Sequence, residues 1–320
     1  MRDAVALHAA LILRARLYAK IRAFFAERGV LEVETPILSE GGNTEPNIES
    51  FATTFNGHVD AGLPERWLRT SPEHGLKRLL ASGIGDCYEL GRVFRNGEAG
   101  QRHNPEFTML EWYRVGFDHR LLARETCELV QIALHLVDRR ATVIECGYRE
   151  WFVEGLGIDP FTATLDELRE PLADIHIATE GLGRDDWLDL LITHCLQPSL
   201  PGDRITLVHD FPQTQCALAK IRDGDPPVAE RFELYLGPHE LANGYHELID
   251  ATEQRARFER DNLRRHARDQ RVMPIDERFL AALSAMPVCA GVALGIERLL
   301  MCLLGSDAID AVLTISFADA

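Results

Sequence analysis

Two glutamates in one expected hairpin have the chemistry of a metal site. Residues 231–248 show the alternating pattern of paired strands, with Gly237-Pro238 at the turn. If the loop is the two residues Leu236 and Gly237, Glu233 and Glu240 stand directly opposite each other. Like charges in that position destabilise a sheet unless something neutralises them. The pattern indicates either a divalent cation, for which oxygen ligands suit Mg²⁺, or a solvated acidic hairpin.

A third glutamate lies on an expected strand beside a phenol. Residues 87–95 and 106–114 both have strand patterns, and the polar stretch 96–105 predicts a long loop between them. By the period of two, one face of the second strand carries Phe107, Met109, Glu111 and Tyr113. This face therefore places a carboxylate next to a hydroxyl group.

The usual nucleotide-binding and zinc-binding motifs are absent. The sequence has no G-x-x-x-x-G-K-[ST] loop and no G-x-G-x-x-G opening a helix, so an ATP site must be built differently. His239 and His246 each precede a glutamate, but their spacing is not H-E-x-x-H, which argues against a zinc site.

Helices are expected on both sides of these strands in the chain. A long amphipathic helix begins near residue 4 and ends at Gly29, and its apolar face carries Leu13, Leu17, Ile21, Phe24 and Phe25. Helices are also predicted at about 251–270 and 276–285, and a strand at 288–295 leads into a helix at 296–304. This pattern favours an α+β fold on an antiparallel sheet over a doubly wound fold.

Length and composition are those of an ordinary globular protein. The 320 residues allow two domains or one large domain with an insertion, at about 150 residues per domain. We expect one domain over residues 1–320, with a mostly helical insertion at about 117–203. The apolar fraction of 46% and the absence of a long apolar run exclude a membrane-spanning helix.

The net charge limits the binding partners that we expect, and the cysteine content indicates the cellular compartment. Fifty acidic residues against 34 basic residues give a net charge of −16, which argues against non-specific nucleic-acid binding. The seven cysteines include no C-x-x-C pair, which favours reduced thiols in a cytoplasmic protein.

Three blocks of residues carry a family resemblance. They are 33–38 after the first helix, 91–95 with 103–113, and 291–298, and in order and spacing they resemble motifs 1, 2 and 3 of class II aminoacyl-tRNA synthetases. RHNPEFTMLEWY and ELANGYHE resemble the lysyl branch. With SPEHGLKRLL at 71–80 and an alanine in motif 3, the chain resembles the stand-alone elongation factor P (R)-β-lysine ligase family, and we expect no anticodon-binding domain in it.

The resemblance implies an ATP site and a magnesium site. Arg95 and Arg298 are implied as catalytic clamps on the phosphates, and Asn104 is expected on the strand that returns from the motif 2 loop. Glu233 and Glu240 are implied as magnesium ligands. The full set of implied ATP contacts is Arg95, Asn96, Gly97, Glu98, Asn104, Phe107, Glu240, Leu241, Gly295 and Arg298.

The resemblance also implies a pocket for a diamino acid. Glu111 and Glu247 match the two carboxylates that bind the two ammonium groups, because a substrate with two amines needs two acceptors. Ala293 stands where lysyl enzymes have glycine, and its methyl group either selects β-lysine over α-lysine or simply packs. The implied pocket residues are Ser71, Pro72, Glu73, Glu111, Tyr113, Asn243, Glu247 and Ala293.

One position departs from the family pattern. The motif 2 sequence is commonly Arg-Asn-Glu-Glu, but here Arg95 and Asn96 are followed by Gly97 and Glu98. The carboxylate expected near the adenine amino group is therefore missing at its place. Glu98 can replace it only if Gly97 lets the loop shift.

The expected function is ATP-dependent activation of (R)-β-lysine as an adenylate, followed by transfer to a lysine ε-amine of translation elongation factor P. The alternatives are an enzyme that charges tRNA or another acceptor, and a non-catalytic amino-acid-binding paralogue. ATP and Mg²⁺ are the expected cofactors, with no direct nucleic-acid partner. The motif 1 helix, with its apolar face and following short strand, suits isologous pairing in a homodimer.

Overall fold

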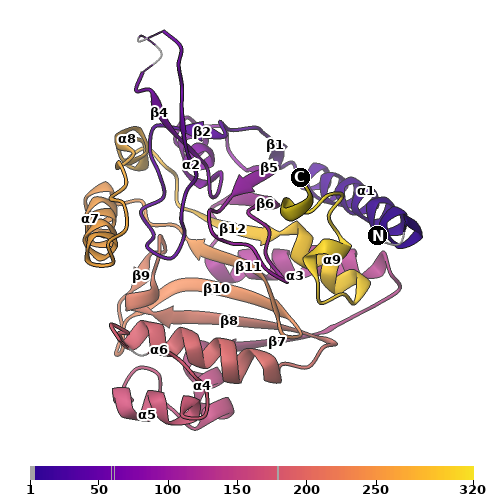
Figure 1. The fold of residues 1–320 in the computed structure, drawn as a ribbon, viewed down its shortest axis with the longest axis vertical. Helices are drawn as coiled ribbons and strands as arrows, with labels where there is room; N and C mark the ends of the chain where they lie inside the picture. The colour runs from indigo at the N-terminus through magenta and orange to yellow at the C-terminus, as the bar shows by residue number, and fades with distance from the viewer. Residues whose placement is uncertain (1–3, 59, 61, 179) are drawn as a thin grey trace. The chain divides into compact units, whose positions relative to one another are not determined.

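The structure, a computed structural model, describes residues 4–58, 60, 62–178 and 180–320. The chain forms two compact units, Met1–Gly116 with Ile249–Ala320, and Phe117–Leu248 (Figure 1). Each unit carries strands that pair mostly antiparallel and helices that pack against them, so the predicted α+β class is confirmed. The single domain over residues 1–320 stays a prediction.

The first unit is organised around four strands in the order β1-β5-β6-β12. β1 runs parallel to β5, and the β5–β6 and β6–β12 pairs are antiparallel. The predicted hairpin over 87–114 is therefore confirmed. The strand bounds are β1 Leu31–Glu32, β5 Cys87–Phe94, β6 Glu106–Val115 and β12 Cys289–Gly295, and a smaller sheet holds β2 Leu38–Ser39, β4 Glu65–Leu68 and β3 Ala52–Thr54.

Helix α1 (Ala4–Glu27) packs its apolar face into the core of the first unit. Phe25 stacks on Tyr88 with ring centroids 4.3 Å apart and meets Trp112 edge-on. Gly29 follows the helix at φ +68°, a conformation that glycine adopts without strain. This face packs in the core of its own unit, and the pairing of two copies in a homodimer stays a prediction.

Helix α9 (Ile296–Leu304) begins directly after β12. Its buried Glu297 accepts hydrogen bonds from the Thr108 backbone N–H at 2.8 Å and from Arg14 at 2.8 Å. These bonds join α9 to β6 and α1, and so hold the first turn of α9 in place. The other helices of this unit are α2 (Glu73–Ala81), α7 (Ala251–Ala267) and α8 (Glu277–Leu283).

The second unit has the strand order β11-β10-β8-β7, with β9 also paired to β10. The bounds are β7 Thr142–Gly147, β8 Arg204–Pro212, β9 Ile221–Arg222, β10 Val228–Leu236 and β11 His239–His246. Helices α4 (Tyr148–Leu156), α5 (Leu165–Arg169) and α6 (Arg184–Leu191) lie together at the lower edge of Figure 1. Their apolar side chains form one core with Phe211 and Tyr235. Residues 117–203 are thus mostly helical, with β7 among them.

The β10–β11 hairpin differs from the predicted register. Tyr235 lies opposite Glu240, and Glu233 lies opposite Asn243, so the prediction that the two glutamates are direct partners is wrong. The loop is Gly237-Pro238, and the register shifts between Leu234 and Tyr235. The turn lies one residue later than predicted, which pairs Glu240 with Tyr235. A bulge at Leu241 then adds one residue and pairs Glu233 with Asn243.

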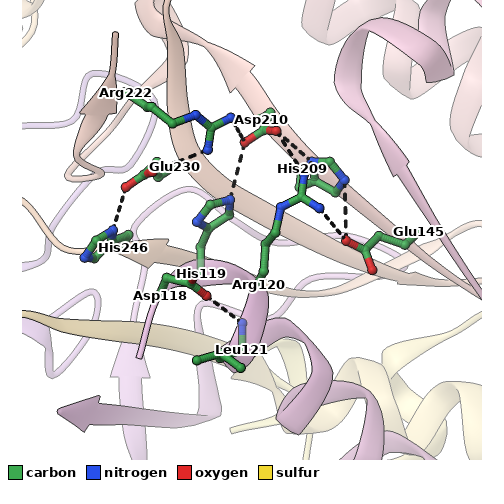
Figure 2. Close-up of polar contacts among 10 residues, drawn as sticks. All are labelled: Asp118, His119, Arg120, Leu121, Glu145, His209, Asp210, Arg222, Glu230 and His246. Carbon is green, nitrogen blue, oxygen red and sulfur yellow. Dashed lines mark hydrogen bonds and ion pairs between the residues drawn. The ribbon is translucent and has the colours of Figure 1, made fainter. Parts of the chain in front are cut away.

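A polar network ties helix α3 (His119–His135) to the strands of the second unit (Figure 2). Asp210, at φ +60°, lies at its centre. Its carboxylate is 3.3 Å from His119 Nε2, 3.1 Å from His209 Nδ1 and 2.9 Å from Arg222. Burial alone would raise the pKa of Asp210, but hydrogen bonds from these three side chains outweigh burial and hold its pKa well below the ordinary value.

We expect Asp210→Asn to lower the free energy of unfolding by about 2 kcal/mol at pH 7, because it removes the charged acceptor that faces His119, His209 and Arg222. A carboxyl group with a depressed folded-state pKa stabilises the fold above its unfolded-state pKa of about 3.9. The deficit of the variant should therefore shrink as the pH falls below 4. Urea unfolding of both proteins at several pH values measures this difference in the free energy of unfolding.

Asp138→Asn is the matched control. Asp138 also has a positive φ, +56°, and among the described residues it has no ion pair. Asparagine tolerates this conformation, so the control isolates the charge. Equal effects of the two substitutions would contradict the electrostatic explanation.

Among the described residues, no helix combines the length and apolar character needed to cross a membrane.

Candidate active site

Glu111 is a buried carboxylate on β6, with 3% of its surface exposed. The Ser71 hydroxyl donates to its Oε2 at 2.6 Å, and the Tyr113 hydroxyl donates to its Oε1 at 2.9 Å. In the part of the chain that the structure describes, no cation forms an ion pair with it. The predicted neighbours Ser71, Glu111 and Tyr113 are thus brought together around an acidic group that lacks a counterion in its own unit.

Burial, together with the nearby charge of Glu73, raises the pKa of Glu111 to about 8, against the two hydroxyl hydrogen bonds and the charge of Lys77. Glu73 itself forms an ion pair with Lys77, whose side chain is 1% exposed. The two acids therefore differ, since Glu73 is already neutralised and Glu111 is not. A cationic ligand at Glu111 would remove the cost of its buried charge.

A row of three residues crosses the sheet at this point. Glu89 on β5 and Ala293 on β12 both lie directly opposite Glu111 on β6. Arg69 forms an ion pair with Glu89 at 2.6 Å, and the Thr35 hydroxyl donates to the same carboxylate at 2.7 Å. Side chains directly opposite each other share a face, so Ala293 presents its methyl group beside Glu111.

The turn before α2 holds the remaining pocket residues of the first unit. Pro72 precedes the first helical residue, Glu73, and Ser71 Oγ accepts a hydrogen bond from the Glu73 backbone N–H at 3.0 Å. Ser71 therefore binds the helix start and Glu111 at once, which fixes its side chain.

The motif 2 loop brings Arg95 close to two other predicted residues. Its guanidinium lies 5.2 Å from the centroid of the Phe107 ring and 3.7 Å from the Glu98 carboxylate. Gly97 has φ +82°, a conformation that glycine adopts without strain. Asn96 donates its backbone N–H to Glu49 O at 2.8 Å. Glu98 is turned toward Arg95 in this structure.

Arg298 and Asn104 have partners that the sequence does not indicate. Arg298, in the first turn of α9, lies 3.1 Å from His103 Nε2. Asn104 lies two residues before β6, not on the returning strand, so that prediction is wrong. It accepts a hydrogen bond from the Phe317 backbone N–H at 3.1 Å and donates to Glu106 O at 2.6 Å. Gly295 precedes α9 as its cap.

In the second unit, one face of the β10–β11 hairpin collects the predicted acidic residues. The register places Glu233, Tyr235, Glu240 and Asn243 on the same face, because opposite residues share a face. Glu247 follows β11 in a bridge with Ala219, and it is 3% exposed. Leu241, also buried, is the extra residue of the bulge. Glu247 and Glu111 belong to different units, so their joint binding of one substrate stays a prediction.

Glu233 lies close enough to Glu240 to sense its charge. Burial raises the pKa of Glu233, Arg231 opposes this, and Glu240 raises it again. Carboxylate oxygens are the ligands that Mg²⁺ prefers, so these two residues fit the ion. Among the described residues, no cluster of three or more His, Cys, Asp or Glu is arranged for a metal. Two carboxylates suffice for an ion that takes its other ligands from phosphates and water.

Sequence reasoning missed the residues that support this site. Lys77 and Arg69 neutralise the acids beside Glu111, Arg231 contacts Glu233, and His103 contacts Arg298. For two of these residues, the spacing in the sequence could have indicated the contact. Arg231 precedes Glu233 by one strand period, and Lys77 follows Glu73 by one helical turn.

Comparison with known proteins identifies the family. Residues 3–318 match the family described as tRNA synthetases class II (D, K and N). The chain belongs to this family. The resemblance predicted from the three sequence motifs is therefore confirmed.

Similar proteins are found among the elongation factor P (R)-β-lysine ligases of this family. The protein of that name from Haemophilus influenzae Rd is 47% identical over 95% of this chain and 93% of its own length. Those from Vibrio cholerae and Pasteurella multocida are 46% and 45% identical, over 96% and 97% of this chain and 95% of their own lengths.

Proposed function

We propose that this class II synthetase family member activates (R)-β-lysine with ATP and transfers it to a lysine ε-amine of translation elongation factor P. The name of its relatives supports the acceptor and the amino acid. The observation that carries the proposal is the buried Glu111, held by two hydroxyl groups and with no ion pair among the described residues. An ammonium group of a diamino acid supplies the missing charge.

The reaction needs alignment and charge placement more than a protein nucleophile. The amino-acid carboxylate attacks the α-phosphate of ATP and pyrophosphate leaves, and then the acceptor amine attacks the acyl carbon and AMP leaves. In our proposal Arg95 and Arg298 hold the phosphates, where fixed cations stabilise developing charge. Mg²⁺, held by Glu233 and Glu240, would neutralise phosphate charge.

The other predicted contacts complete the proposal. Asn96, Gly97, Glu98, Asn104, Phe107, Leu241 and Gly295 would line the nucleotide, and Ser71, Pro72, Glu73, Tyr113, Asn243, Glu247 and Ala293 would surround the amino acid. Ser71 and Tyr113 support this because they already orient Glu111. Arg95 supports it because the Phe107 ring and Glu98 hold its side chain.

We also propose a cytoplasmic homodimer. All seven cysteines are free thiols, as in most cytosolic proteins. Near β1 and β2, Leu31, Ile37 and Leu38 are exposed by 53%, 41% and 47%, and such apolar side chains suit an interface with a second copy. A monomer in light scattering at micromolar concentration would contradict the dimer.

The decisive experiment is pyrophosphate exchange with a panel of diamino acids, followed by transfer to purified elongation factor P. We expect (R)-β-lysine to support faster exchange than α-lysine, and the factor to gain one lysyl group. Faster exchange with α-lysine, or charging of tRNA in place of the factor, would refute the substrate assignment.

Ala293→Gly should shift the preference from β-lysine toward α-lysine. The methyl group lies opposite Glu111, and one methyl-sized change in a pocket alters discrimination by about tenfold. The ratio of kcat/KM for the two isomers measures the effect. Ala290→Gly is the matched control, because Ala290 is buried in the same strand but lies opposite Arg114. An equal shift in the control would contradict a role for the Ala293 methyl group.

A further inference from the structure

Arg231 is the basic side chain on the acidic face of the β10–β11 hairpin. Its neighbour across the strands is Tyr245, and its side chain is 16% exposed. The guanidinium lies over the Phe211 ring at 4.5 Å from the centroid. Packing against the ring holds the group in a plane, because an arginine stacks well on an aromatic face.

Each nitrogen of this guanidinium has its own acceptor. Nη1 donates to the Gln215 backbone oxygen at 2.9 Å, Nε donates to Asn243 Oδ1 at 3.3 Å, and Nη2 forms a short ion pair with Glu233 Oε1. The Gln215 contact anchors Arg231 to the backbone outside the hairpin. The other two contacts are to side chains that we propose as a metal ligand and a pocket residue.

Both oxygens of Glu233 are held in this arrangement. Arg231 binds Oε1, and the Tyr235 hydroxyl donates to Oε2. Each carboxylate oxygen accepts more than one contact, so the group can still bind a cation. Without Arg231, Glu233 would lose one of these two contacts and would face the charge of Glu240 with no compensating cation from the hairpin.

We infer that Arg231 is a positioning residue that orients Glu233 toward bound magnesium and Asn243 toward the amino acid. This inference rests on the proposed function and adds a residue to its site. Arg231 acts through its two partners, and it joins the metal-binding side of the hairpin to the substrate-binding side. Lysine has one nitrogen and cannot make three separate contacts, so it should replace only part of the role.

The test compares Arg231→Met and Arg231→Lys with the unaltered protein. Calorimetry measures the Mg²⁺ dependence of binding of a non-hydrolysable ATP analogue, and pyrophosphate exchange measures KM for β-lysine. We expect Arg231→Met to raise the Mg²⁺ concentration for half-maximal binding by tenfold or more and to raise KM. Arg231→Lys should keep much of the Mg²⁺ response of the unaltered protein, but its KM for β-lysine should remain raised.

Arg222→Met is the matched control. Arg222, on β9, forms ion pairs with Glu230 at 3.3 Å and Asp210 at 2.9 Å (Figure 2). Glu230 precedes Arg231 on β10, so Arg222 serves the opposite face of the same strand. The control should lower the thermal midpoint and leave the Mg²⁺ response unchanged.

The inference is overturned if Arg231→Met and Arg231→Lys unfold at lower temperature but keep the Mg²⁺ response and the KM of the unaltered protein. That result would make Arg231 structural, like Arg222. Nucleotide binding does not depend on which amino acid is activated. If the unaltered protein did not activate β-lysine, the proposed function would be refuted. The Mg²⁺ dependence of nucleotide binding in the variants would still test the role of Arg231.

Discussion

Glu111→Gln should raise KM for β-lysine by roughly two orders of magnitude, since removing one partner of a buried charge pair costs about 3 kcal/mol. The glutamine keeps the size of the side chain and removes only the charge. The carboxylate that binds an ammonium group must be ionised, and burial raises the pKa of Glu111 to about 8 in the free protein. In the unaltered enzyme, affinity for the amino acid should therefore fall as the pH drops below 8. This dependence should be lost in the variant.

Thermal unfolding separates this effect from a loss of folding. A pKa of about 8 keeps Glu111 mostly uncharged in the free protein at pH 7, so Glu111→Gln removes little charge and the thermal midpoint should stay nearly the same. Glu89 lies on β5, directly opposite Glu111. Glu89→Gln should lower the thermal midpoint, because it leaves buried Arg69 without its anionic partner. A Glu111 variant that folds normally and keeps its KM would rule out recognition of the ammonium group by this residue.

Arg298→Ala should lower kcat for pyrophosphate exchange by about two to three orders of magnitude. A fixed donor aimed at developing charge contributes about 3 to 4 kcal/mol, by analogy with single oxyanion donors. Arg298 is in the first turn of α9, which Glu297 ties to β6. The side chain is thus presented from a rigid element, and its removal should change the rate much more than the thermal midpoint.

Arg298→Lys tests whether charge alone is enough. Lysine keeps the charge but loses the planar fork that binds phosphate through two donors, so we expect partial recovery of kcat. His103→Ala removes the neighbour that Arg298 contacts and should have a smaller effect than loss of the arginine itself. Full exchange activity in Arg298→Ala would remove this residue from the phosphate site.

Local patterns in the sequence predicted the elements and the family. The helix from residue 4 ends as predicted near Gly29, and α9 spans the predicted residues 296–304. Such elements are read from periodicity and from glycine at helix ends, which depend on near neighbours in the chain. The motifs around Arg95 and Arg298 identified the family, which the comparisons confirmed.

Tertiary structure alone decided the register and the counterions. The Gly237-Pro238 loop placed Tyr235 opposite Glu240, and the bulge beyond this pair placed Glu233 opposite Asn243, because one extra residue shifts every later pair and leaves no mark in the alternation. Likewise, Glu89 and Glu111 are both acids on neighbouring strands, but only the fold supplied Arg69 to Glu89 and left Glu111 without an ion pair among the described residues. Charge compensation depends on residues that are distant along the chain, so the chemical difference of Glu111 arises only when the strands pair.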